Sequence, residues 1–328
     1  MPTVARVAVV NQGGKFGGKT LAANREFIMA LLDAALAERP DVVCLPEAFP
    51  AGNLGELPLA ERAEPVPGPS TDACAGRARR GRCHVICAVK TRRDGRFWNS
   101  AVLIDRAGQI AGIYDKLCPV TRTPDYTGME GGVNPASELP VFDLDFGRVG
   151  VQICFDAGFP ENWAALGEKG ARLVFWSSAY EGGFPLQAYA WLHRYYVASS
   201  VRHGRSRLID PLGAVLAESA DGPGHLCRRI NLDNVVFHGD FNHRIAERIA
   251  AAYGERVEVR SSAPGSGHYL VEPRDASVTT AALMAEFGFE SAAQYHDRHR
   301  EAYRHLRAGR SAPPQQAAHG TRGQYVGE

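Results

Sequence analysis

Short apolar runs alternate with helix-like segments along most of this 328-residue chain, and this alternation sets its fold class. Runs rich in β-branched residues at 5–10 and 148–154 predict strands, and helical periodicity at 20–37 and 160–169 predicts helices. We expect further strands at 83–90, 97–105, 108–115, 141–144, 172–176, 206–210, 213–218 and 226–232, and further helices at 71–82 and 186–200. Apolar strands with helices between them predict an α/β fold in which sheet is covered by helices.

Three of the predicted strands end at residues that can carry out chemistry. Cys154 follows an apolar run at the point where the chain turns toward a new helix. Glu47 follows the short apolar run at 41–44, and Lys116 follows the run at 108–115. A thiol, a carboxylate and an ammonium group at three strand ends form a Glu–Lys–Cys set.

This set of residue types suits hydrolysis through a covalent intermediate. A free cysteine has a pKa of about 8.5, so it needs a base to become the attacking thiolate. We expect Glu47 to be that base, with its own pKa raised by burial. Lys116 would stabilise the thiolate and the oxyanion of a tetrahedral intermediate, and the backbone N–H of Phe155 would be the second oxyanion donor. The scheme requires neither a histidine nor a cofactor, unlike that of cysteine–histidine hydrolases.

Several stretches of the chain carry motifs in a fixed order: 6–10, 42–50, 98–105, 108–116, 146–156 and 209–213. With these motifs, roughly residues 4–234 resemble the nitrilase superfamily of carbon–nitrogen hydrolases. The catalytic residues of the family fall on Glu47, Lys116 and Cys154. Its second glutamate, which orients the lysine and helps to position substrate, falls on Glu130, with Asp125 and Glu138 in the same loop as the alternatives. The resemblance implies a four-layer α-β-β-α sandwich, which the strand pattern alone does not choose over three layers.

The residues after the cysteine narrow the expected reaction. Nitrile-hydrolysing members usually carry Trp-Glu there, whereas this chain has Phe155-Asp156, which resembles the amidase and carbamoylase branches. We expect cleavage of an amide or ureido C–N bond in a small molecule; nitrile hydrolysis and an inactive binding protein are the alternatives. Because Ala157-Gly158 provide no arginine for a substrate carboxylate, a neutral or cationic substrate is favoured. Trp176 and Tyr180 are expected at the pocket rim, with a place in the core as the alternative.

The resemblance ends near residue 234 and divides the chain. We expect 1–234 to form the hydrolase domain and 235–306 a C-terminal extension. Within the extension, helices are predicted at 241–253 and 279–306, and a strand at 256–260. Such extensions often cross subunit interfaces in this superfamily, which predicts a homodimer or larger homo-oligomer. The last segment, 307–328, is rich in Gly, Pro, Gln and Arg, and is predicted to be disordered.

Composition and charge favour a cytoplasmic enzyme. A net charge of +1 provides no overall field for nucleic acid or a membrane surface. We find no apolar run of the roughly 18–20 residues that span a bilayer, and we expect no secretory signal. Seven cysteines, an odd number, favour free thiols in a reducing compartment. Cys83 and Cys87 suggest a metal site, but their spacing is wrong for a C-x-x-C motif and predicts a strand, so no metal is expected.

The segment from Gly13 to Thr20 supports a competing hypothesis. It matches the phosphate-binding pattern G-x-x-x-x-G-K-[ST] after a strand and before a helix. Glycine-rich amides at a helix N-terminus form an anion site. However, the next strand leads to Glu47 where a magnesium-organising aspartate is expected, and no water-positioning element follows. We prefer a glycine-rich loop at the rim of the active site, with nucleotide binding as the alternative.

Overall fold

The computed structural model describes residues 3–239, 242, 244–261 and 267–314. The chain divides into two compact units, one over Thr3–Ile230 and one from Asn231 onward. Each unit has a hydrophobic core of its own. Within the described residues, no helix is both long enough and apolar enough to cross a bilayer.

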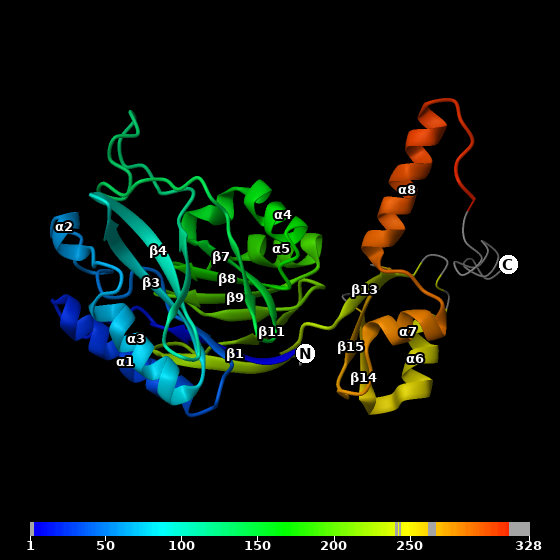
Figure 1. Cartoon of the computed structure of the whole chain (residues 1–328), viewed down its shortest axis with the longest axis horizontal. Helices are drawn as coiled ribbons and strands as arrows, with labels where there is room; N and C mark the ends of the chain where they lie inside the picture. Colours follow the sequence, from blue (N-terminus) through cyan, green and yellow to red (C-terminus); the bar gives the residue numbers. More distant parts are fainter. Residues whose placement is uncertain (1–2, 240–241, 243, 262–266, 315–328) are drawn as a thin grey trace. The chain divides into compact units, whose positions relative to one another are not determined.

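The first unit contains two six-stranded sheets (Figure 1). The first sheet has the order β12-β1-β2-β3-β4-β5. Its strands are β1 (Val4–Asn11), β2 (Val42–Cys44), β3 (His84–Arg93), β4 (Arg96–Ile104), β5 (Ile110–Asp115) and β12 (Gly224–Asn231). The pairs β1–β2 and β2–β3 are parallel, whereas β4 pairs antiparallel with both β3 and β5.

The second sheet repeats this arrangement in the order β11-β10-β9-β8-β7-β6. Its strands are β6 (Val141–Leu144), β7 (Gly147–Ile153), β8 (Leu173–Ser178), β9 (Tyr196–Val201), β10 (Arg207–Ile209) and β11 (Val215–Glu218). The central strands β7, β8 and β9 are parallel, and antiparallel strands flank them. Parallel strands that leave a sheet in one direction bring the residues that follow them to the same edge.

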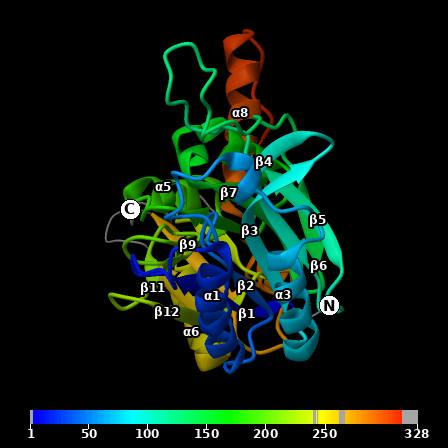
Figure 2. The same cartoon turned by 90° about the vertical axis from the view of Figure 1, so that its left-hand side faces the viewer.

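The two sheets lie face to face between two layers of helices. Buried serine hydroxyls connect the sheets, since Ser177 Oγ donates to the Leu45 carbonyl at 2.8 Å and Ser200 Oγ donates to the Val10 carbonyl at 2.7 Å. Helices α1 (Leu21–Leu36) and α3 (Pro69–Gly81) share an apolar cluster with the first sheet. Helices α4 (Pro160–Glu168) and α5 (Phe184–His193) share an apolar cluster with the second sheet. Figure 2 shows α1 and α3 next to each other. The layers are α-β-β-α, which confirms the predicted fold class.

The prediction of one helix over 186–200 is wrong in its second half. Helix α5 ends at His193, and Arg194 adopts a left-handed φ of 58°. The next residues form β9, which is buried throughout and pairs in parallel with β8. Its run of Tyr, Val, Ala, Ser, Ser and Val favours a strand by the β-branched and aromatic residues it contains. The prediction of an apolar segment at these residues is correct, but the helical period assigned to it is wrong.

The second unit is a small α/β structure. Strands β13 (Val235–His238), β15 (His268–Pro273) and β14 (Val257–Ser261) form an antiparallel sheet in that order. Its helices are α6 (Ile245–Tyr253), α7 (Thr280–Phe287) and α8 (Ala292–Arg307). Strands β13 and β15 were not predicted, and they give this unit more internal structure than an extended arm requires. Of the tail predicted over 307–328, residues 315–328 lie outside the described part of the chain.

Candidate active site

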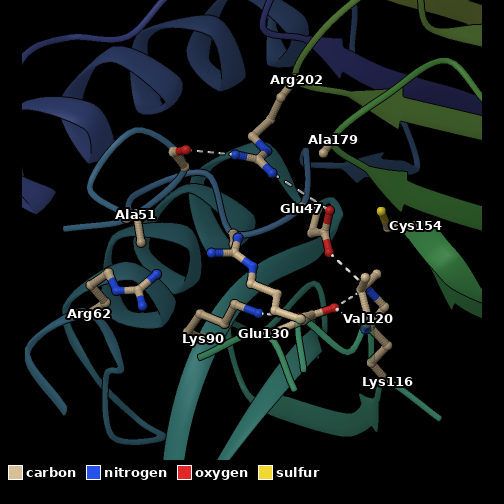
Figure 3. A pocket seen from close by; sticks show the side chains of 14 residues that line it. Glu47, Ala51, Arg62, Lys90, Lys116, Val120, Glu130, Cys154, Ala179 and Arg202 are labelled. Atoms are coloured by element: carbon tan, nitrogen blue, oxygen red, sulfur yellow. Dashed lines mark hydrogen bonds and ion pairs between the residues drawn. The ribbon is translucent and has the colours of Figure 1, made fainter. Parts of the chain in front are cut away.

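The strand ends bring the four predicted catalytic residues to one pocket. Cys154 directly follows β7, Lys116 directly follows β5, and Glu47 comes three residues after β2. Glu130 reaches the same place from the loop between β5 and β6. All four line a cavity of about 260 Å³ (Figure 3).

The backbone at Cys154 forms a sharp turn that is fixed by a buried carboxylate. Cys154 has a φ of 50°, which is uncommon for a residue other than glycine and often marks a functional site. Asp156 Oδ2 accepts from the Ile153 amide at 2.8 Å and from the Tyr114 hydroxyl at 2.7 Å. Its Oδ1 accepts from the Cys118 amide at 2.9 Å. Asp156 therefore ties the turn at the cysteine to the chain that follows Lys116.

The Cys154 thiol is protonated at rest. Burial raises its pKa to about 11, and the nearby Glu47 carboxylate adds to this shift. Lys116 and hydrogen bonds from the Ala179 amide and the Ser178 hydroxyl lower it only in part. A thiol with this pKa needs a base next to it to react as a thiolate near neutral pH.

Glu47 is a buried carboxylate that is surrounded by donors. Its Oε1 accepts from Lys116 Nζ at 3.2 Å and from Asn99 Nδ2 at 2.8 Å, and its Oε2 lies 3.8 Å from Arg202 Nη2. Burial acts to raise the pKa of Glu47, but Lys116 and Arg202 outweigh it and the pKa is lowered. The expected rise in this pKa is therefore wrong, because the sequence did not reveal the second cation.

Glu130 is held between two buried lysines. It forms ion pairs with Lys90 and Lys116, and it accepts from Asn99 Nδ2 at 2.9 Å. Burial opposes its ionisation, but the two lysines lower the pKa of Glu130 to about 2. Burial would likewise lower the pKa of Lys116, but Glu47 and Glu130 outweigh this effect and raise it. Lys116 is thus a permanent ammonium group fixed by two carboxylates.

Sequence reasoning missed several residues of the pocket. Asn99 bridges Glu47 and Glu130, and it lies within a motif that was recognised without a role for this residue. Lys90 is buried like the rest of the network, and a possible signal is that it is, like Lys116, one of only five lysines in a chain with 32 arginines. The arginines that line the pocket, Arg62, Arg122 and Arg202, have no such signal, because the chain contains 32 arginines.

The two predicted rim aromatics are not among the residues that line the pocket, although the half-exposed Tyr180 lies close enough for Cys154, Lys116 and Glu47 to affect its pKa. Trp176 is fully buried against the helix layer, because neighbouring Ser177 faces the other sheet and side chains alternate along a strand. Its indole Nε1 donates to the Cys154 carbonyl at 3.0 Å and so supports the turn from behind. The Tyr180 ring packs edge-on against the Trp176 ring, with 5.2 Å between the ring centroids. The Phe155 side chain is 42% exposed, and the role of its amide stays a prediction.

The glycine-rich loop from Gly13 gives no support to nucleotide binding. The Gly14 amide donates to the Arg202 carbonyl at 2.7 Å, and the Gly18 amide donates to Asn24 Oδ1 at 3.1 Å. Amides that are already paired within the protein do not form a phosphate cradle. The loop instead connects β1 to α1 and supports the backbone at Arg202.

Cys83 and Cys87 lie within the apolar cluster between the first sheet and its helices. Between them, His84 places its Nε2 3.0 Å from Asp145 Oδ1. Among the residues that the structure describes, no group of three His, Cys, Asp or Glu side chains is arranged to hold a metal ion.

Comparison with known proteins places the chain in a family. Residues 6–236, more than two thirds of the sequence, match the family model described as carbon-nitrogen hydrolase. The chain belongs to the carbon–nitrogen hydrolase family. It is 29% identical over 226 residues to a β-ureidopropionase from Arabidopsis thaliana, which covers 65% of this chain and 51% of that protein. It is 28% identical over 232 residues to a deaminated glutathione amidase from Synechocystis, covering 62% of this chain and 85% of that protein. The chain thus spans about half the length of the plant relative.

Solved structures share the fold. Nit3 from Saccharomyces cerevisiae, described as a member of branch 10 of the nitrilase superfamily, has a TM-score of 0.61 at 18% identity. The match covers 70% of this chain and 90% of that one. A mutant amidase from Nesterenkonia, with the acetamide moiety of fluoroacetamide added covalently at its active-site cysteine, has a TM-score of 0.59 at 19% identity. That match covers 69% of this chain and 90% of the amidase.

Proposed function

We propose that this carbon–nitrogen hydrolase cleaves an amide or N-carbamoyl C–N bond of a small molecule through a thioester on Cys154. One observation carries the proposal: Cys154, Glu47, Lys116 and Glu130 line the same pocket, and the last three are joined by ion pairs. The names of the two relatives, a ureidopropionase and an amidase, agree with this substrate class.

In the acylation step, Glu47 accepts the thiol proton as Cys154 Sγ attacks the substrate carbonyl carbon. A C–S bond forms and the carbonyl π electrons move to oxygen. The resulting oxyanion is stabilised by the Lys116 ammonium and by the amide of Phe155. When the intermediate collapses, the C–N bond breaks, and Glu47 returns the proton to the leaving nitrogen. Ammonia or an amine departs.

In the deacylation step, a water molecule gives a proton to Glu47 and attacks the thioester carbonyl carbon. The same two donors stabilise the second oxyanion. The C–S bond then breaks, Cys154 recovers its proton from Glu47, and the acid product leaves. Glu130 holds Lys116 in place throughout, through their ion pair. No residue outside this network has to transfer a proton.

An ammonia-release screen with the purified protein tests this function. Primary amides, ureido acids and nitriles of similar size are compared at equal concentration. We expect ammonia from members of the first two groups and none above the blank from nitriles. Release from nitriles alone would contradict the proposal and support nitrile hydrolysis on the same residues.

Replacement of Lys116 tests the oxyanion role. Lys116→Ala should lower kcat by on the order of a hundredfold or more, the effect of losing one oxyanion donor. Lys116→Arg should fail as well, because a planar guanidinium does not replace a compact ammonium in a site that is 1% exposed. Steady-state kinetics measure both, and Lys169→Ala, at the exposed end of α4, is the control. Near-normal turnover in Lys116→Arg would show that the lysine does not act on the substrate.

A further inference from the structure

The pocket is strongly cationic, although the whole chain has a net charge of only +1. Its lining includes two carboxylates, Glu47 and Glu130, and five cationic side chains: Arg62, Lys90, Lys116, Arg122 and Arg202. Three of these cations already have partners, since both lysines pair with Glu130 and Arg202 pairs with Glu47. Arg62 and Arg122 are left to face the cavity.

Arg62 is the last residue of the short helix α2 (Leu59–Arg62) and is partly buried. Figure 3 shows its guanidinium directed into the pocket, on the side opposite Cys154. Its Nε is buried without a hydrogen-bond partner, and in the described part of the chain no carboxylate lies within ion-pair distance of it. A Cβ at Gly131 would lie 3.2 Å from Arg62 Nη2, so the glycine next to Glu130 leaves room for this group.

Arg122 reaches the pocket from the loop that also carries Glu130. The backbone on either side of it is fixed by a β-bridge between Thr121 and Met129, and the Arg122 amide donates to the Gly128 carbonyl at 3.3 Å. Its side chain is exposed, and among the described residues it forms no ion pair. The loop therefore presents a second arginine to the cavity from a defined position.

We propose that Arg62 and Arg122 bind a carboxylate of the substrate while its carbonyl carbon lies at Cys154. Guanidinium groups match carboxylates by paired, charge-assisted hydrogen bonds, which makes arginine the usual residue for this recognition. The substrate class is then a short-chain acid with an amide or ureido group at its other end. This inference rests on the proposed function for the bond that is cleaved, and adds the charge and the second anchoring point of the substrate.

The proposal reverses the expectation of a neutral or cationic substrate. That expectation rested on Ala157-Gly158, which provide no arginine directly after the nucleophile. The fold supplies arginines from two other elements, α2 and the loop after β5, which are 92 and 32 residues away from Cys154 in the sequence. Sequence proximity to the cysteine was therefore the wrong guide to the charge of the pocket.

Matched substrate pairs test the proposal. Each pair differs in one group, a carboxylate replaced by a methyl: glutaramate against pentanamide, and 3-ureidopropionate against propylurea. We expect the wild type to favour an acid over its neutral partner by about tenfold or more in kcat/KM. Arg62→Ala and Arg122→Ala should each lower kcat/KM for the acids by roughly ten- to hundredfold, mainly through KM, which is the scale of one charge-assisted hydrogen bond. Turnover of the neutral partners should stay within about twofold.

Arg148→Ala is the matched control, because Arg148 lies at the far end of the strand that leads to Cys154 and pairs with Asp143. Arg148→Ala should leave kcat/KM unchanged for both members of each substrate pair. Arg62→Lys should recover part of the preference, since it restores the charge without the paired donors. Equal turnover of acids and neutral partners, or equal losses on both in the arginine variants, would overturn the proposal.

A binding measurement separates this proposal from the proposed function. Calorimetric titration of Cys154→Ala with glutaramate and 3-ureidopropionate needs no turnover. If Cys154→Ala binds the acids and the Cys154→Ala/Arg62→Ala double variant does not, the carboxylate site is supported. This holds even if the wild type hydrolyses neither acid, a result that would contradict only the proposed function. Hydrolysis of pentanamide without binding or preference for either acid leaves the function standing and rejects the carboxylate site. If the acids are neither bound nor hydrolysed, the carboxylate site is rejected as well.

Discussion

Cys154→Ala is expected to reduce turnover to the uncatalysed level while the protein stays folded. The thioester cannot form without the sulfur, and removal of a covalent nucleophile costs on the order of a millionfold in kcat in a serine protease. The side chain is small and borders a cavity, so its loss leaves the sheets in place. Ammonia release measures the first effect, and thermal unfolding by circular dichroism measures the second.

Cys118→Ala is the matched control for this experiment. Cys118 is a second, more exposed cysteine close to the site, and it accepts from Asn162 Nδ2 at 3.6 Å. Burial, with Asp156 nearby, raises the pKa of its thiol to about 11, so it resembles Cys154 in acidity but is not among the residues that line the pocket. We expect this variant to retain activity within about threefold. Loss of activity in Cys118→Ala with activity kept in Cys154→Ala would place the nucleophile elsewhere.

Glu47→Gln is expected to remove nearly all acylation. The amide keeps the shape of the side chain and its contacts with Asn99 and Lys116, but it cannot accept the thiol proton. Because general bases contribute about 10²–10⁴-fold, and because the thiol pKa is raised, we expect a loss on the order of a thousandfold or more. Glu130→Gln should cost less, roughly ten- to hundredfold, since its role is to position Lys116. Equal, mild losses in both would show that these are the wrong carboxylates.

The pH profile gives a second readout for Glu47. Its pKa is lowered by Lys116 and Arg202, so kcat/KM should begin to fall only when the pH drops below the ordinary glutamate pKa of about 4.3. Protonation of Glu47 removes the base, so activity decreases toward acid. At high pH, activity should fall near the thiol pKa of about 11. Glu47 and Cys154 then no longer hold the proton that the leaving nitrogen needs. An acidic limb between pH 6 and 7 would indicate a different base.

The sequence allowed the prediction of those parts of the site that depend on where a residue lies relative to its own strand. Cys154, Glu47 and Lys116 each follow a predicted strand, so their places at strand ends could be predicted from the sequence. Cys154 follows a strand of the second sheet and the other two follow strands of the first, so their proximity depends on how the sheets meet. The face-to-face sheets came from the family resemblance, because strand patterns do not report which faces meet. Strand β9 was assigned to a helix because its aromatic and β-branched run follows a real helix without a glycine or proline between them.

The parts that could not be predicted depend on tertiary contacts. Arg62 and Arg122 lie far from Cys154 in the sequence, and nothing in their local surroundings distinguishes them from the other arginines. The direction of the Glu47 pKa shift was wrong for the same reason, since Arg202 follows a strand of the second sheet and meets Glu47 only in the folded chain. Charge balance in a pocket is a property of the fold, so sequence position alone does not give it.

The most direct test of the proposed chemistry is mass spectrometry of the protein after acid quench during turnover of its best substrate from the ammonia-release screen. Acid traps the thioester, and peptide mapping locates it. We expect one peptide, the one containing Cys154, to gain the mass of the acyl group, and the gain to be absent from Cys154→Ala. Turnover with Cys154 unmodified and the acyl group on Cys44 or Cys118 would contradict the assignment of the nucleophile.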